Sequence, residues 1–193
     1  ECLDEILHGG YLTERALLES VSVDGKFIDS PNGRIVNPGH SLEAAWFILA
    51  EGIVTKNDEA VEAAKKIIDI TLPLGIDKKH GGLIAFTDLD GKPPVQLEWD
   101  MKLWWPHNEA LIASLMIYKE TGDEKYLDTF GKILTYCKET FSTAPCGEWY
   151  GYLRRDGQPT MPACIGSTFK GPFHVPRCLI MLDTMMKEIE ERG

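Results

Sequence analysis

Side chains that can exchange protons with a small molecule precede predicted helices at three places in the chain. The first place is residues 37–46, where His40 and Glu43 stand three residues apart and therefore share one face of a helix near its start. A histidine next to a carboxylate has a defined tautomer and a pKa in the range useful for acid and base catalysis. Spacing alone also fits a histidine that makes one ordinary hydrogen bond in the first helical turn, and it favours that interpretation.

The second place, residues 98–109, combines aromatic rings with charged groups. Its twelve residues include three tryptophans, among them Trp104 and Trp105, together with Lys102, a histidine and three carboxylates that include Glu109. Sugars bind through stacking of their C–H faces on aromatic rings and through hydrogen bonds to their hydroxyls. At least one tryptophan is expected to be a core residue at a helix junction, but the density of polar groups predicts a sugar-binding pocket.

The third place, residues 169–177, holds His174 in a loop of glycine and proline, with Arg177 in the helix that follows. His174 is 134 residues from His40, so only the fold can bring the two histidines together. Two histidines that face each other across a pocket could act as base and acid on opposite faces of one carbon atom. His8 and His80 lie beside Gly-Gly turns and are expected to be loop residues.

The elements that must position these residues follow a repeat. Asp-Gly pairs begin at residues 24, 90 and 156, so successive copies are 66 residues apart, and each follows a run typical of a strand. This pattern predicts three β-hairpins. Between them, apolar residues recur at helical spacing and predict helices over residues 40–51, 58–71, 106–120, 123–139 and 176–190. Asn57 or Asp58 is the predicted N-cap of the second helix, and Pro73 with Gly75 is expected to end it.

Tandem helix pairs either stack as a solenoid or close into a ring. The long hairpin and loop before each first helix favour the ring, an α/α barrel. Six pairs of about 66 residues need roughly twice this chain, which holds about three. We therefore predict an all-α fold in which residues 1–193 form half of a single (α/α)6 barrel domain, with short β-hairpins between the helix pairs.

The composition excludes several classes of partner. A net charge of -10 argues against nucleic acid and anionic membranes, because both are bound by clustered positive charge. No apolar run approaches the ~18 residues of a membrane span. The five cysteines contain no Cys-x-x-Cys pair, so a disulfide framework or zinc site is not expected, and scattered thiols fit a reducing cytosol. No P-loop sequence is present.

Four separated motifs are specific enough to compare with known families. They are Asn-Pro-Gly-His-Ser-Leu-Glu-Ala-Ala-Trp at 37–46, Asp-Met-Lys-Leu-Trp-Trp-Pro-His-Asn-Glu-Ala at 100–110, Gly-Glu-Trp-Tyr-Gly-Tyr-Leu at 147–153 and Phe-Lys-Gly-Pro-Phe-His-Val-Pro-Arg-Cys-Leu at 169–179. Together they resemble the N-acylglucosamine 2-epimerase (renin-binding protein) family. The similarity covers essentially the whole chain and corresponds to the C-terminal half of that family. The family fold is an (α/α)6 barrel.

The resemblance implies a reversible conversion of N-acetylglucosamine and N-acetylmannosamine. A base removes the C2 proton of the open-chain sugar, and an acid returns a proton to the other face of the enediolate. By motif, His40 and His174 match the two catalytic histidines, and Glu43 matches an acid that orients or tunes the first.

The resemblance also assigns roles to other residues and to partners. Glu109 matches a pocket carboxylate, and Trp104, Trp105, Lys102 and Arg177 are expected to line the pocket. It implies no required metal or cofactor, ATP as an allosteric activator, a homodimer and a cytoplasmic location.

One departure from the family is large, because its N-terminal half has no counterpart in these 193 residues. That half supplies an arginine for the enediolate oxygen, and stabilisation of such an oxyanion is usually among the largest catalytic terms. The chain also starts at Glu1, which we interpret as a truncation point. The resemblance therefore implies a partial chain that is inactive alone.

Three other functions stay open at this point. A sugar isomerase would move the proton from C2 to C1 on the same scaffold. A glycosidase would use two carboxyls among Glu43, Glu109 and Glu148, ~5–10 Å apart across the scissile bond, and would leave the histidines without a purpose. A protein-binding module, with renin as the partner, would need no catalysis.

Overall fold

The computed structural model describes residues 1–144 and 146–191, which are predominantly helical as predicted. The helices are α1 (Cys2–His8), α2 (Pro31–Arg34), α3 (Pro38–Thr55), α4 (Asp58–Gly75), α5 (Trp104–Thr121), α6 (Glu124–Thr140), the short 3-10 helix η1 (Phe141–Thr143) and α7 (His174–Glu190). The strands are β1 (Ile35–Val36), β2 (Thr87–Asp88), β3 (Lys102–Leu103) and β4 (Tyr152–Leu153).

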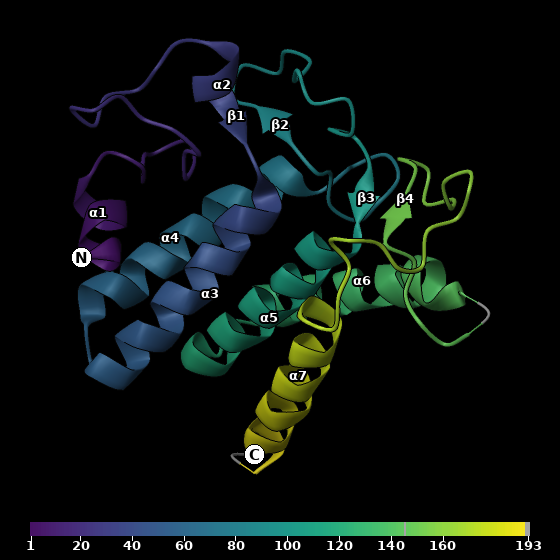
Figure 1. Cartoon of the computed structure of the whole chain (residues 1–193). Helices are drawn as coiled ribbons and strands as arrows, with labels where there is room; N and C mark the ends of the chain where they lie inside the picture. The colour runs from purple at the N-terminus through teal and green to yellow at the C-terminus, as the bar shows by residue number, and fades with distance from the viewer. Residues whose placement is uncertain (145, 192–193) are drawn as a thin grey trace.

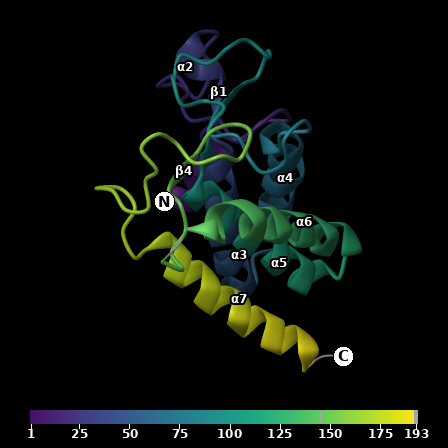
Figure 2. The same cartoon turned by 90° about the vertical axis from the view of Figure 1, so that its right-hand side faces the viewer.

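The long helices form an open arc of two layers (Figures 1 and 2). Helices α3, α5 and α7 lie side by side and run in the same direction, so that their first residues lie at the end of the molecule that carries the strands. We call them the inner helices, because the predicted ring would place them around its axis. Helix α4 packs against α3, and α6 packs against α5. No helix of the described ranges is long and apolar enough to cross a membrane.

Helix α5 lies at the centre of the core. Almost every residue from Trp104 to Ile117 is buried, because α3, α6 and α7 surround this helix. A helix that is apolar on all sides is stable only in such a position. By contrast, α6 and α4 bury one face and expose the other. The start of α5 is therefore the best-anchored part of the molecule.

The five predicted helices are confirmed, and several of their ends differ by one to four residues. Asn57 caps α4 by accepting a hydrogen bond from the Ala60 N–H at 3.2 Å. Helix α4 continues through Pro73, because Thr71 and Leu72 are buried and a proline in the last turn removes only one hydrogen bond. Helices α3 and α7 begin earlier than expected. His40 lies in a first helical turn as predicted, whereas His174 lies in a first helical turn rather than in the expected loop.

The Asp-Gly turns form as predicted, but the strands pair with other partners. In each turn the glycine has φ between +70° and +81°, and its N–H donates to the carbonyl three residues earlier at 2.8–2.9 Å. The ladders, however, join β1 to β2 and β3 to β4, both antiparallel. The strand before one inner helix thus pairs with the strand before the next Asp-Gly turn. These ladders fix the starts of α3 and α5.

Lys102 does not line a pocket, which corrects the prediction made from its motif. Its side chain is fully buried in β3, and Nζ donates to Asp77 Oδ2 at 3.1 Å. Arg155 Nε donates to the same oxygen at 2.8 Å. Burial lowers the pKa of Lys102 to about 8. Burial alone would raise the pKa of Asp77, but hydrogen bonds from Arg155, the Lys79 N–H and Lys102 hold it well below its usual value. This cluster, the Asp77 cluster, anchors β3 and β4 beside the start of α5.

We expect Asp77→Asn to lower the free energy of unfolding by about 3 kcal/mol at pH 7, because it leaves buried Lys102 without its counter-ion. The pKa of Asp77 is depressed below its ordinary 3.8, so the stability it contributes is complete above about pH 4 and is lost as the pH falls further. Urea denaturation of both proteins should therefore show a difference that shrinks below pH 4. Asp128→Asn, which breaks the exposed ion pair with Lys132, is the control and should cost no more than about 0.5 kcal/mol.

Candidate active site

The first turns of the inner helices converge on one cavity. His40 is in the first turn of α3, His174 is the first residue of α7, and both face a space of about 430 Å³. The residues that line it come from all three inner helices, the strands and the loop before α7: His40, Glu43, Glu98, Leu103, Trp104, Trp105, Tyr152, Phe169 and His174. The fold therefore brings together the two histidines that the sequence separates.

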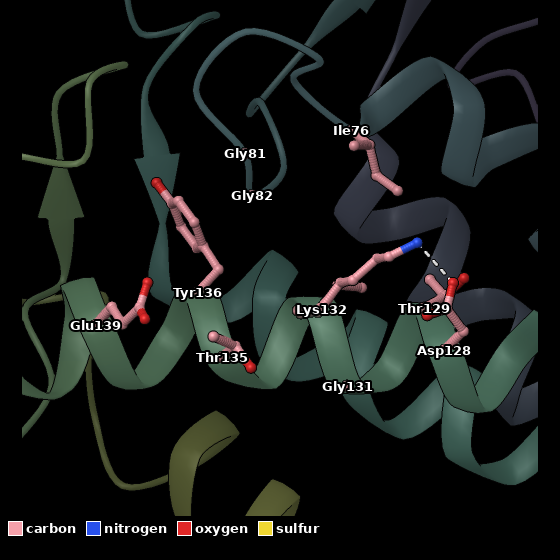
Figure 3. Close-up of a pocket in the computed structure, with 11 residues that line it drawn as sticks. Ile76, Gly81, Gly82, Asp128, Thr129, Gly131, Lys132, Thr135, Tyr136 and Glu139 are labelled. Atoms are coloured by element: carbon pink, nitrogen blue, oxygen red, sulfur yellow. Dashed lines mark hydrogen bonds and ion pairs between the residues drawn. The ribbon is translucent and has the colours of Figure 1, made fainter.

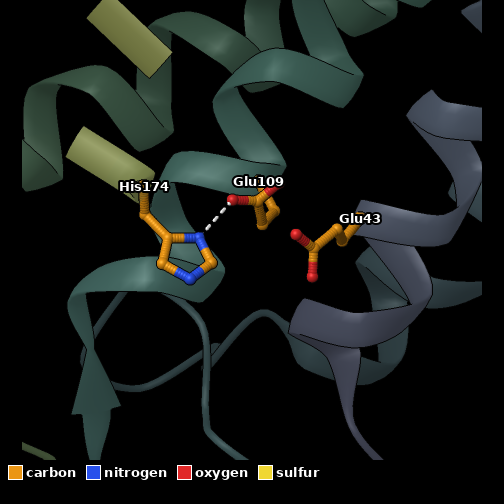
Figure 4. Close-up of side chains that lie close together, drawn as sticks. All are labelled: Glu43, Glu109 and His174. Atoms are coloured by element: carbon orange, nitrogen blue, oxygen red, sulfur yellow. Dashed lines mark hydrogen bonds and ion pairs between the residues drawn. The ribbon is translucent and has the colours of Figure 1, made fainter. Parts of the chain in front are cut away.

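Glu109 is the buried anion behind this cavity. Its side chain is fully buried, and Oε1 accepts hydrogen bonds from His174 Nδ1 at 2.7 Å and from Arg177 Nη2. Oε2 accepts from the Trp46 indole N–H at 2.7 Å. A buried carboxylate is tolerated only when donors satisfy it in this way. Because an ionised carboxylate can only accept, His174 carries a proton on Nδ1, and its second nitrogen points away from Glu109 (Figure 4).

Arg177 links the second acid to this group. Its Nη2 lies 3.4 Å from Glu43 Oε1, and its guanidinium packs over the rings of Phe173 and Trp46 at 4.1 and 5.1 Å. Figure 4 shows Glu43 beside Glu109, the two carboxylates coming from neighbouring helices. Burial raises the pKa of Glu43, and the nearby charge of Glu109 raises it further, against the opposing effects of His174, Arg177 and His40.

Glu43, Glu109 and His174 offer ligand atoms within 4.8 Å of one another, a spacing that a metal ion could bridge. The contacts of the two carboxylates point to the Arg177 guanidinium, rather than a metal ion, as the cation at this position. Arg177 already donates to both carboxylates and would have to leave before a metal could bind. We conclude that the guanidinium supplies the positive charge at this position.

His40 has a different setting from His174. Its side chain is about half exposed, and Nδ1 lies 3.0 Å from Glu19 Oε2. This hydrogen bond raises the pKa of His40 despite partial burial, and the charge of Glu43 adds to the effect. Glu43, the partner expected from the sequence, therefore raises the pKa of His40 only through its charge, whereas Glu19 makes the hydrogen bond to Nδ1.

Trp105 lies between the two histidines. Its ring centroid is 5.0 Å from that of His40 and 5.7 Å from that of His174. The Trp105 ring can occupy this place because residue 39 is a glycine, and a Cβ at that residue would lie 2.5 Å from the ring. The indole thus contacts both imidazoles of the cavity.

The structure places most of the predicted site residues together. His40, His174, Glu43, Trp104 and Trp105 line the cavity, although Trp104 is almost wholly buried and offers little surface. Glu109 and Arg177 lie directly behind it, and Lys102 lies apart in the Asp77 cluster.

Other sequence candidates lie elsewhere, and two site residues were missed. Glu148 pairs with Lys170 at 3.1 Å and lines a separate cavity. The missed residues are Trp46 and Glu19. Trp46 lies three residues after Glu43 on the same helical face, a spacing that could have revealed it. Glu19 lies 21 residues before His40 in an irregular segment, and no local pattern marks it.

A larger cavity of about 800 Å³ lies on the outer surface between α6 and the Gly81–Gly82 turn (Figure 3). Its lysine, Lys132, is paired with Asp128, and its aromatic residue, Tyr136, stacks on His107. Burial lowers the pKa of His107 to about 3, so this imidazole stays neutral and serves to join Leu83 N–H to the Leu103 carbonyl. His40, Glu43 and His174 instead line the smaller cavity.

Comparison with solved structures defines the class of fold. The chain is similar to a D-mannose isomerase structure, with a TM-score of 0.80 and 21% identity over 94% of this chain and 48% of that one. It is also similar to cellobiose 2-epimerase from Bacillus thermoamylovorans, with a TM-score of 0.77 and 24% identity over 96% of this chain and 45% of that one. The fold is that of (α/α)6 barrel proteins, and the described residues form an open part of such a barrel.

The sequence comparison identifies the family. Residues 9–173 match the family model described as N-acylglucosamine 2-epimerase (GlcNAc 2-epimerase). The chain is 46% identical to N-acylglucosamine 2-epimerase of Bos taurus over 99% of its own length and 45% of the bovine protein. The chain belongs to the N-acylglucosamine 2-epimerase family and spans about half the length of the curated relatives it matches.

We expect Gly39→Ala to displace Trp105 and to lower the free energy of unfolding by about 1–3 kcal/mol, because the new methyl group overlaps the indole ring. Gly131→Ala is the matched control: it is also helical, and its Cβ would meet nothing within 4 Å. That variant should gain about 0.5–1 kcal/mol. Equal effects of the two substitutions in thermal or urea denaturation would contradict the close packing of Gly39 on Trp105.

Proposed function

We propose that this chain carries the proton-transfer groups of a sugar 2-epimerase that interconverts N-acetylglucosamine and N-acetylmannosamine. One observation carries the proposal: His40 and His174 both contact the Trp105 ring in the same cavity, and each has its Nδ1 on a carboxylate. Each imidazole therefore has its Nε2 available for a substrate. Family membership and the name of the bovine relative support the same reaction.

The proposed chemistry starts from the open-chain sugar, whose aldehyde makes the C2 proton acidic. One histidine removes this proton and forms an enediolate, and the other donates a proton to the opposite face of C2. The indole of Trp105 gives the C–H surface of the sugar a face on which to stack between the two histidines. The carboxylates hold the tautomers that allow both steps.

Two alternatives make different use of the same groups. An aldose–ketose isomerase would return the proton to C1, and one of the similar solved structures is that of a D-mannose isomerase. A glycosidase needs a free carboxylate pair, whereas Glu109 is fully buried and already accepts from three donors. We therefore favour an epimerase or an isomerase over a glycosidase.

The resemblance to the family also carries expectations about regulation and assembly. ATP as an allosteric activator, a homodimer, renin as a protein partner and a cytoplasmic location remain predictions. That no cofactor is required is likewise a prediction. None of these expectations enters the proposed chemistry.

We expect His40→Asn and His174→Asn each to lower kcat of the full-length protein by about 10²–10⁴-fold, because each removes a general acid or base. The reaction is run on N-acetylmannosamine in D2O, and NMR measures how much deuterium enters at C2. The same spectra show whether the product is an aldose or a ketose. His80→Asn, a histidine outside the cavity, is the matched control and should retain activity. Undiminished turnover in both site variants would refute the proposal, and a ketose product would replace it with the isomerase.

A further inference from the structure

The partner of His40 comes from outside the inner helices. Glu19 lies in the irregular segment between α1 and α2, and its carboxylate is about one-quarter exposed. The residues before it are firmly held: Leu17 belongs to the main core, and Leu18 packs with Val36 of β1 in a second cluster. The Leu18 N–H donates to the Tyr11 carbonyl at 2.9 Å. Glu19 is thus presented to His40 from an anchored backbone.

The two histidine–carboxylate pairs of the site differ in how their carboxylates are used. Glu109 divides its charge among His174, Arg177 and Trp46. Within residues 1–144 and 146–191, the side chain of Glu19 has His40 as its hydrogen-bonding partner and no second cation. Glu19 is therefore free to hold the imidazole of His40 alone.

Other charged and titratable groups face His40 across the cavity. Glu43 comes from its own helix, Glu98 from the connection before α5, Tyr152 from β4 and His174 from α7. Of these, Glu43 is itself held by Arg177 at 3.4 Å. Glu19 therefore makes the shortest and most direct polar contact of His40, at 3.0 Å.

We propose that Glu19 is a positioning residue that fixes Nδ1 of His40 and directs Nε2 of His40 into the cavity. This inference rests on the proposed function for its catalytic meaning. The Glu19–His40 contact itself does not, and it can be tested by titration alone.

The test compares Glu19→Gln, Glu19→Ala and the control Glu14→Gln. Glu14 lies in the same segment, and its exposed carboxylate pairs with Lys66 instead. In wild type, an NMR titration of His40 should show a midpoint above that of Glu19→Gln, since the amide keeps an acceptor but loses the charge. Glu14→Gln should leave the midpoint unchanged.

Activity of the full-length protein gives the second readout. Loss of the Glu19 charge lowers the pKa of His40, so in the direction of reaction in which His40 is the acid the alkaline limb of the kcat/KM profile should move to lower pH by the same amount as the titration. Glu19→Ala should lower kcat by roughly tenfold to a hundredfold with little change in KM, because the imidazole loses its orientation as well. Glu19→Asp should restore part of that loss.

The outcomes separate this inference from the proposed function. If wild type epimerises the sugar but Glu19→Gln changes neither the His40 midpoint nor the alkaline limb, Glu19 is not a positioning residue. If the His40 midpoint falls as expected but wild type shows no exchange at C2, the contact stands and the proposed function fails. If Glu19→Ala unfolds at a lower temperature than wild type, the results for Glu19→Gln still decide whether Glu19 is a positioning residue. Glutamine preserves the size and hydrogen-bonding shape of the side chain.

Discussion

Burying a charge costs several kcal/mol unless donors surround it, and Glu109 imposes that constraint at the centre of this molecule. Its donors come from α3 through Trp46 and from α7 through His174 and Arg177, while Glu109 itself belongs to α5. All three inner helices must therefore hold one relative position for the carboxylate to be satisfied. The same hydrogen bonds orient His174 toward the cavity, so packing of the helices and geometry of the site depend on the same interaction.

The two histidines of the site differ in their exposure to solvent. His174 lies against Glu109 and the aromatic rings of α5, whereas His40 is half exposed at the rim and depends on a carboxylate from an irregular segment. Trp105 separates the two and is accommodated by the missing side chain of Gly39. This asymmetry gives two chemically identical side chains different environments.

Local patterns predicted the elements of the fold well, and long-range contacts account for what they missed. Helical periodicity and the 66-residue spacing of Asp-Gly turns located five helices and three turns, because both depend on neighbouring residues. Strand pairing was not predictable, since each two-residue strand pairs with a partner about fifty residues away, and so short a run carries no register information. The prediction that Lys102 lines the pocket was wrong for a similar reason, because its burial depends on Asp77, which lies 25 residues earlier.

The exchange of strands between successive units also determines where one unit ends. A segment cut at helix boundaries, from the start of α3 to the end of α4, would separate α3 from β1 and leave β2 without its ladder. A segment that begins at the strand before an inner helix and extends through the following Asp-Gly turn keeps its two-stranded ladder. Duplication, deletion or circular permutation of this barrel is therefore best tolerated when the breakpoints follow the Asp-Gly turns, in the loops that precede each strand and inner helix.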